Sequence, residues 1–141
     1  MGRVRNEHVT PEIVYKKLKS ILTGKWSDER VVKTVLSWGL SKVTKENLEW
    51  AIRENVDLIT LAFNHYHLGN PMIKPLFKLV LKVYWNPIEE YLTDVNKIYA
   101  VIVKNKPDCK EILDTPEGRD YLNRLVDAAY NYLYELAWGE E

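Results

Sequence analysis

The placement of proline constrains the fold of this chain more than any other feature of its sequence. The six prolines stand beside residues that favour a helix start or in short connectors, where the fixed φ and the missing N–H of proline cost nothing. They are residues 11, 71, 75, 87, 107 and 116. Residues 10–12 and 115–117 both read Thr-Pro-Glu, the order of capping hydroxyl, proline and acid that a helix N-terminus prefers. The sequence therefore predicts an all-α protein.

Apolar side chains recur at steps of three and four residues, which is the spacing of one helix face. The predicted helices are residues 11–23, 28–38, 45–68, 87–104 and 116–138, with a short helical turn at 107–113. The second half of the 45–68 helix is apolar nearly all round, so we expect it to run through the centre. The chain has 141 residues, 46% of them hydrophobic, which is enough for one packed core. The expected architecture is a single-domain bundle of about six to seven helices around the 45–68 helix, with residues 1–9 as a flexible basic arm.

Residues 72–85 suit a buried strand as well as a helix, because their apolar side chains are nearly continuous. Lys74, Lys78 and Lys82 recur every fourth residue, which places them on one stripe of a helix and also on one face of a strand. A strand would need a partner, and the only other β-like run, residues 98–103, continues a helical pattern. We therefore expect a helix here, with a strand as the alternative.

The composition excludes several classes of protein. Twenty Lys and Arg balance twenty Asp and Glu, and the hydrophobic fraction is too high for a disordered chain. No run approaches the roughly 18 uninterrupted apolar residues of a membrane span, and the first ten residues lack the apolar region of a signal peptide. A single cysteine, Cys109, excludes an internal disulfide. We expect a cytoplasmic protein with no membrane partner. The chain contains no glutamine, as is typical of thermophile proteins, but its ten asparagines are not typical of them.

Charge is unevenly distributed along the chain although it sums to zero. Up to residue 45 there are ten Lys or Arg and four acids, whereas from residue 111 onward there are two basic and eight acidic residues. Clustered Lys and Arg raise the local affinity for phosphates, so the N-terminal third indicates an anionic partner, with nucleic acid as the leading candidate. The alternative is that the charged faces are merely solvated, with basic and acidic helices packed side by side or placed head to tail in an oligomer.

Residues 38–44, with the sequence Trp-Gly-Leu-Ser-Lys-Val-Thr, resemble the turn of helix-turn-helix DNA-binding domains. In that family a glycine ends the first helix, a small hydroxyl residue acts as a cap, and the second helix enters the major groove. The resemblance departs from the family at Lys45, where a buried apolar residue is usual. It implies DNA binding by the helix that follows Thr44. The alternative is an ordinary helical hairpin whose first helix ends at Gly39.

Lys74, Lys78 and Lys82, here called the lysine stripe, would lie roughly 6 Å apart on a helix, a spacing that suits successive phosphates. The same pattern would also solubilise the outer face of an apolar helix. Nucleic acid, either DNA or RNA, is the predicted partner, bound by phosphate neutralisation with little reading of bases. The predicted contacts are Arg3, Arg5, Lys16, Lys17, Lys19, Lys42, Lys45, Lys74, Lys78 and Lys82.

Aromatic residues make up 11% of the chain, and Tyr130, Tyr132 and Tyr134 cannot all point inward from one helix. At least one of them is therefore expected to be exposed. An exposed ring can stack on a nucleobase, but it is more typical of a protein interface. The competing hypothesis is an interaction module that forms homo-oligomers through Tyr132, Tyr134 and Trp138.

The sequence contains little that indicates catalysis. The E-x-x-E of residues 46–49 and the E-x-x-D of residues 54–57 are similar to motifs of all-α nucleotide pyrophosphohydrolases, which hold magnesium on paired helical carboxylates. Here both pairs fall on one predicted helix, and E-x-x-D recurs elsewhere by chance. His65 and His67 point to different helix faces and cannot chelate one ion. We predict a non-catalytic protein with no metal, cofactor or small-molecule ligand; a metal-dependent nucleotide hydrolase is the third hypothesis.

Overall fold

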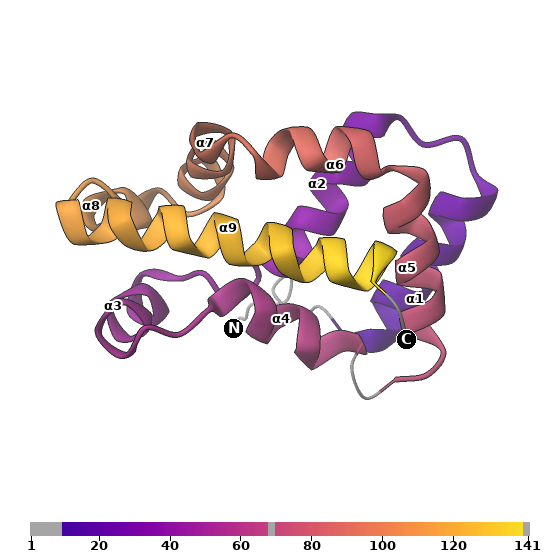
Figure 1. Ribbon diagram of the computed structural model, residues 1–141, viewed down its shortest axis with the longest axis horizontal. Helices are drawn as coiled ribbons and strands as arrows, with labels where there is room; N and C mark the ends of the chain where they lie inside the picture. The colour runs from indigo at the N-terminus through magenta and orange to yellow at the C-terminus, as the bar shows by residue number, and fades with distance from the viewer. Residues whose placement is uncertain (1–9, 68–69, 140–141) are drawn as a thin grey trace, which may run out of the picture.

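The computed structural model describes residues 10–67 and 70–139, and every regular element in those ranges is helical (Figure 1). In chain order the elements are α1 (Pro11–Thr23), α2 (Asp28–Gly39), α3 (Lys45–Glu54), α4 (Leu58–His67), α5 (Ile73–Val83), α6 (Trp85–Leu92), α7 (Val95–Asn105), η2 (Pro107–Cys109), α8 (Lys110–Leu113) and α9 (Pro116–Trp138). The all-α prediction is confirmed, and within the segment 72–85, which suited a strand or a helix, residues 73–83 form the helix α5. The predicted arm of residues 1–9 lies outside the described residues.

Side-chain hydroxyls cap four helices at residues that the sequence marks as helix starts. The hydroxyls of Thr10 and Thr115 accept hydrogen bonds from the backbone N–H three residues later, at 3.3 and 2.9 Å, and so begin α1 and α9. Ser27 and Thr44 cap α2 and α3 in the same way. Each cap satisfies an N–H group that the first turn of a helix leaves without an intrahelical partner, which is worth about 1 kcal/mol.

The prediction of one helix at 45–68 is wrong, because the structure divides this segment into α3 and α4. Asn55 adopts the left-handed conformation, with a φ of 57°, and ends α3. Asp57 then caps α4: its Oδ1 accepts from the backbone N–H groups of Ile59 and Thr60, both at 3.1 Å, and its Oδ2 accepts from the Thr60 hydroxyl at 2.6 Å. Asn tolerates positive φ and Asp is a strong N-cap, so together they interrupt an apolar period that continues on both sides.

The prediction of one helix at 87–104 is wrong for a similar reason. The structure forms α6 and α7 here, with a break at Thr93 and Asp94. The Asp94 Oδ1 accepts from the backbone N–H of Asn96 at 3.0 Å and caps α7. Short polar side chains such as these bond to nearby backbone groups and thereby compete with continuation of a helix. The break allows both helices to contact α9.

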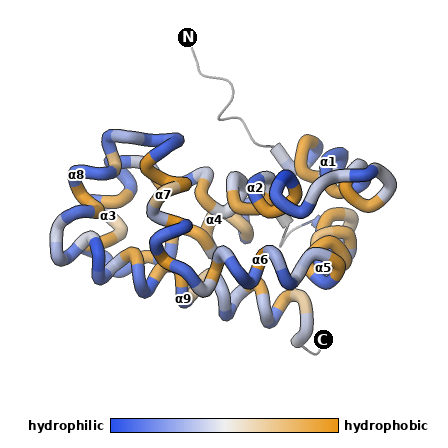
Figure 2. Tube along the Cα trace, turned by 90° about the horizontal axis from the view of Figure 1, so that it is seen from above, coloured by the Kyte–Doolittle hydropathy of each residue, from blue (hydrophilic) through white to orange (hydrophobic). Residues whose placement is uncertain are grey.

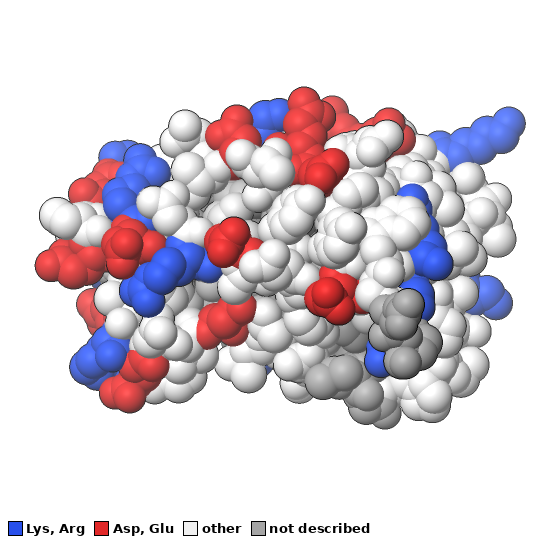
Figure 3. All heavy atoms as spheres, in the orientation of Figure 1, with Lys and Arg blue, Asp and Glu red and all other residues white. Residues whose placement is uncertain are grey.

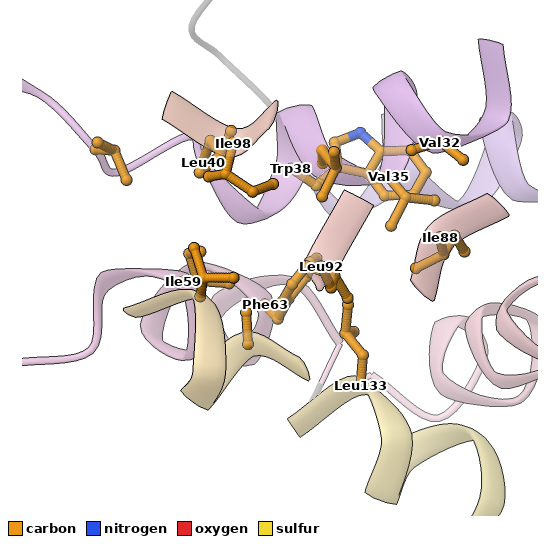
Figure 4. Packing of buried hydrophobic residues seen from close by; sticks show 14 of the residues in the cluster. Val32, Val35, Trp38, Leu40, Ile59, Phe63, Ile88, Leu92, Ile98 and Leu133 are labelled. Atoms are coloured by element: carbon orange, nitrogen blue, oxygen red, sulfur yellow. The ribbon is translucent and has the colours of Figure 1, made fainter. Parts of the chain in front are cut away.

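The centre of the bundle is α9, rather than the 45–68 segment. It contacts α3, α4, α5, α6, α7 and α8 and runs along most of the molecule (Figure 1). Its inward face buries Tyr121, Leu125, Ala129 and Leu133 at steps of four residues. In Figure 4, Leu133 from α9 and Phe63 from α4 point into the same cluster, which side chains from α2, α6 and α7 complete. One continuous hydrophobic cluster therefore holds the helices together.

Gly39 permits a close approach of two helices in this core. It is the last residue of α2 and is buried. A Cβ at this position would lie 2.6 Å from Cζ of Phe63 and 3.3 Å from Cγ2 of Ile59, both on α4. Those side chains are themselves 1% and 3% exposed, so they have little space into which to move. Glycine is thus required here by helix packing.

No helix in the described parts of the chain has both the length and the hydropathy needed to cross a bilayer. With 23 residues, α9 reaches the necessary length, but charged side chains recur along it.

Candidate functional site

Helices α1 and α5 pack against each other at one end of the molecule, although α2, α3 and α4 separate them in sequence (Figure 1). The buried face of α1 includes Val14 and Leu18, and that of α5 includes Phe77 and Leu81. Because the apolar faces turn inward, the lysines of both helices lie on the surface of the same end. These six residues, here called the α1–α5 lysines, are Lys16, Lys17, Lys19, Lys74, Lys78 and Lys82.

The α1–α5 lysines belong to segments without acidic residues. No Asp or Glu occurs in residues 13–27 or 58–88. Among the described residues, Lys16, Lys17 and Lys74 take part in no ion pair. Figure 3 shows the result on one face of the molecule: the charged side chains over α5 are basic, whereas basic and acidic side chains alternate over α3 and α8. In the described part of the chain, this end is therefore electropositive on that face.

The structure does not bring all of the predicted contacts to this end. Lys45 begins α3, and its Nζ lies 2.7 Å from Oε1 of Glu111 in α8. This hydrogen bond raises the pKa of Lys45 and lowers the pKa of Glu111, and it ties the lysine to the other end of the molecule. Lys42 lies three residues earlier, in the connection between α2 and α3. The other two predicted contacts, Arg3 and Arg5, lie outside the described residues.

The segment that resembles a helix-turn-helix does not form the packed pair of helices that the family uses. Helix α2 mainly contacts α4 and α6, whereas α3 mainly contacts α8, η2 and α9. Helix α3 exposes three acidic residues, Glu46, Glu49 and Glu54. The same helix carries Trp50, which is 40% exposed. Carboxylates that face a phosphate backbone are unfavourable. The packing and the exposed acids of α3 therefore give no support to this helix as one that reads DNA.

Two of the three aromatic residues predicted at an interface lie on the surface. Tyr134 and Trp138 are 44% and 46% exposed, so the expectation that at least one of the three neighbouring tyrosines is exposed is confirmed. Tyr132 is instead half-buried and packs against the core. Its ring stacks on Phe63, with centroids 5.9 Å apart and planes 5° apart, and its hydroxyl donates to Oδ1 of Asn64 at 2.7 Å. Burial raises the pKa of Tyr132 to about 12.

An aromatic surface runs along α9 where this helix meets α5 and α6. Tyr134 lies nearly parallel to Tyr130, with centroids 6.0 Å and planes 16° apart, and meets Trp85 edge-on at 5.8 Å and 70°. One turn later, the Lys82 Nζ lies 5.7 Å from the ring centroid of Trp138. Tyr134, Trp138 and Lys82 are here called the aromatic edge. The sequence singles out all three residues but carries no signal that Lys82 lies beside Trp138, because these two meet only through the packing of α5 on α9.

Helix α5 and the residue before it also present apolar side chains to solvent. Met72, Leu79 and Val83 are 60%, 47% and 61% exposed, and Leu76 is half-buried. Figure 2 shows hydrophobic residues on successive turns of α5. These four residues, here called the α5 apolar stripe, were missed by sequence reasoning because all apolar residues of this segment fit a buried element equally well.

Other residues with reactive side chains are engaged in packing. Cys109 is buried, and burial raises the pKa of its thiol, which makes it a weak nucleophile.

A hollow of about 220 Å³ lies between the α3–α4 connection and α9. In its lining, the Tyr121 hydroxyl donates to the carbonyl of Val56 and the Arg124 guanidinium donates to Oδ1 of Asn55, each at 2.6 Å. Among the described residues, no three His, Cys, Asp or Glu side chains are placed to share a metal ion.

Comparison of the chain with family models, with curated proteins and with solved structures gives no match. The features that could support a function are therefore those of this chain itself: the α1–α5 lysines, the aromatic edge and the α5 apolar stripe.

Proposed function

We propose that this chain is a non-catalytic binding protein that contacts nucleic acid through the α1–α5 lysines. The main support is the packing of α1 on α5, which gathers two groups of lysines at one end of the molecule. Residues 13–27 and 58–88 contain no Asp or Glu, so a polyanion that approaches these segments meets little repulsion from them; Glu12, in the first turn of α1, is the one acidic residue of the two helices. DNA and RNA share the phosphates that lysine recognises.

The expected mechanism is neutralisation of phosphates rather than reading of base edges. A lysine ammonium is a point charge on a flexible stem, which suits a phosphate and carries little geometric specificity. Release of condensed counterions then supplies much of the binding free energy. The proposed surface leaves out Lys45, which is paired with Glu111 at the other end of the molecule, and Lys42, which lies in the connection that leads to α3.

Titration of labelled DNA and RNA at about 50 and 200 mM salt tests this proposal. We expect the affinity to fall on the order of 10-fold or more between the two conditions, because several phosphates are contacted at once. An affinity that does not change with salt, or an absence of binding at the lower salt, contradicts the proposal.

A matched pair of variants tests where the contact lies. Lys74→Gln combined with Lys82→Gln removes two charges from the α1–α5 lysines, and should weaken binding and reduce the salt slope by about two. The control, Lys42→Gln combined with Lys104→Gln, removes the same number of charges from the α2–α3 connection and from α7. It should leave binding nearly unchanged. Equal losses in the two double variants would mean that net charge sets the affinity, rather than this end of the molecule.

The α5 apolar stripe favours a second candidate function, self-association. Met72, Leu76, Leu79 and Val83 are spaced at four, three and four residues, which is the seam spacing of helices that pack side by side in a coiled coil. A second copy of the chain offers the same seam, so α5 could pack on α5 in a two-fold arrangement. This would bring two lysine stripes near each other, and the resulting repulsion should be relieved by salt.

Light scattering measures the mass of the protein in solution and so tests self-association as the salt concentration rises. The salt dependence separates the two candidates, because salt should strengthen self-association and weaken nucleic-acid binding. We expect the mass to move from one chain toward two as salt rises. Leu79→Glu should keep the chain monomeric, whereas Leu61→Glu, at a residue of α4 that is 41% exposed, serves as the control. A monomer under all conditions, at protein concentrations of about 1 mM, contradicts self-association through α5.

A further inference from the structure

The aromatic edge includes one member of the lysine stripe, so a strand whose phosphates contact α5 would bring its bases close to Tyr134 and Trp138. We infer that these two rings stack on unpaired bases, and that the chain therefore prefers single-stranded nucleic acid to a duplex. The inference rests on the proposed function, because it requires phosphates at the α1–α5 lysines.

The two rings are placed to act together. Tyr134 and Trp138 are four residues apart on α9, so they lie on the same side of the helix and about 6 Å apart along its axis. They are 44% and 46% exposed, which leaves part of each ring open to a ligand. Lys82 holds its Nζ 5.7 Å from the centroid of Trp138, so a positive charge and a stacking surface occur at the same place.

Tyr134 is also held in position before any ligand arrives. Its ring packs on Tyr130 at 6.0 Å and against Trp85 at 5.8 Å. Tyr130 is itself fixed, because its hydroxyl donates to Oε2 of Glu89 in α6 at 2.7 Å. A ring that is already immobilised loses little conformational entropy when it contacts a ligand.

Exposed rings favour a single strand because the bases of a duplex already stack on one another. A flat aromatic side chain gains a contact only with a base whose face is free. The helix that the sequence suggested for reading a groove, α3, carries the exposed acids Glu46, Glu49 and Glu54 and does not suit a duplex. Every base has an aromatic face that can stack, so we expect a preference for a single strand over a duplex rather than for a particular base sequence.

Glu135, an acidic residue next to Tyr134 in the sequence, provides a test in which the affinity is expected to rise rather than fall. Glu135 is exposed and directly follows Tyr134, so its carboxylate should repel a phosphate that approaches the edge. Glu135→Gln should therefore raise the affinity for single-stranded nucleic acid, whereas substitution of the α1–α5 lysines lowers it.

The main experiment compares one labelled oligonucleotide, as a single strand and as a duplex, at about 50 mM salt. The variants are Trp138→Ala, Trp138→Leu and, as a control, Trp50→Ala, since Trp50 is 40% exposed but lies on α3. We expect the single strand to bind more tightly than the duplex. Both Trp138 variants should lose roughly tenfold in single-strand affinity and little in duplex affinity, and Trp50→Ala should lose neither. Thermal unfolding verifies that each variant is folded.

Several outcomes would overturn the inference. Equal affinity for both forms, unchanged by Trp138→Ala, would remove the stacking role and leave the proposed function standing. Affinity that is lost in Trp138→Ala but kept in Trp138→Leu would indicate an apolar contact, such as one with a protein, in place of stacking. Binding of neither form would instead contradict the proposed function itself.

Discussion

At the scale of single residues, Gly39 decides how closely α2 can approach α4. Replacement by alanine would place a methyl group 2.6 Å from the ring of Phe63, which is 1% exposed. Overpacking of this kind typically costs 1–3 kcal/mol, and the better helix propensity of alanine offsets up to about 1 kcal/mol of that. Gly39→Ala should therefore lower the free energy of unfolding by about 1–2 kcal/mol, as measured by denaturant titration.

The control for this prediction is Ser37→Ala, at an exposed position of the same helix, which should change the free energy of unfolding by no more than about 0.5 kcal/mol. An unchanged or higher stability of Gly39→Ala would show that α2 and α4 lie farther apart than the structure places them.

Residue roles could be predicted from the sequence only where they depend on neighbours in the chain. The caps at Thr10 and Thr115 were predictable because donor and acceptor are three residues apart. The position of Tyr132 was not, because its hydroxyl bonds to Asn64 on another helix. The same holds for Trp138, whose exposed ring meets Lys82 only after α5 and α9 have packed.

At the scale of elements, the connection between α3 and α4 depends on Asp57. Its carboxylate accepts three hydrogen bonds, whereas the Asp94 side chain at the start of α7 accepts one backbone N–H. Asp57→Ala should therefore lower the free energy of unfolding by about 1–2 kcal/mol, and Asp94→Ala by less, in parallel denaturant titrations. If Asp94→Ala were the more destabilising of the two, the cap at Asp57 would not be what holds this connection.

The two divided helices show the limit of periodicity as a predictor of elements. Leu48, Ile52, Val56, Ile59 and Phe63 keep a helical spacing across the break, because α3 and α4 both bury their apolar sides in the same core. The information that ends α3 lies in two polar residues, Asn55 and Asp57, whose local bonds outweigh the continuing apolar pattern. The end of a helix is thus set by its polar residues even where its apolar residues suggest continuation.

At the scale of the whole molecule, charge is separated by the way the helices pack. The sequence predicts a basic N-terminal third, but half of the α1–α5 lysines come from α5, in the middle of the chain. These lysines reach the same end as the lysines of α1 because two helices that are distant in the sequence pack together. Local sequence patterns do not encode that contact. At the other end, pairs such as Lys45 with Glu111 and Lys110 with Asp114 are mutually compensated. Exposed pairs of this kind contribute little stability, about 0–1 kcal/mol each.

The central place of α9 has a consequence for biosynthesis. Translation delivers the chain from its N-terminus, so α1 to α8 are made before the helix against which six of the other elements pack. At about 5–20 residues per second, synthesis of the 23 residues of α9 takes roughly one to five seconds. Throughout that interval the nascent chain offers chaperones the apolar surfaces that α9 will later cover, and the complete core can form only after residues 116–138 have left the ribosome.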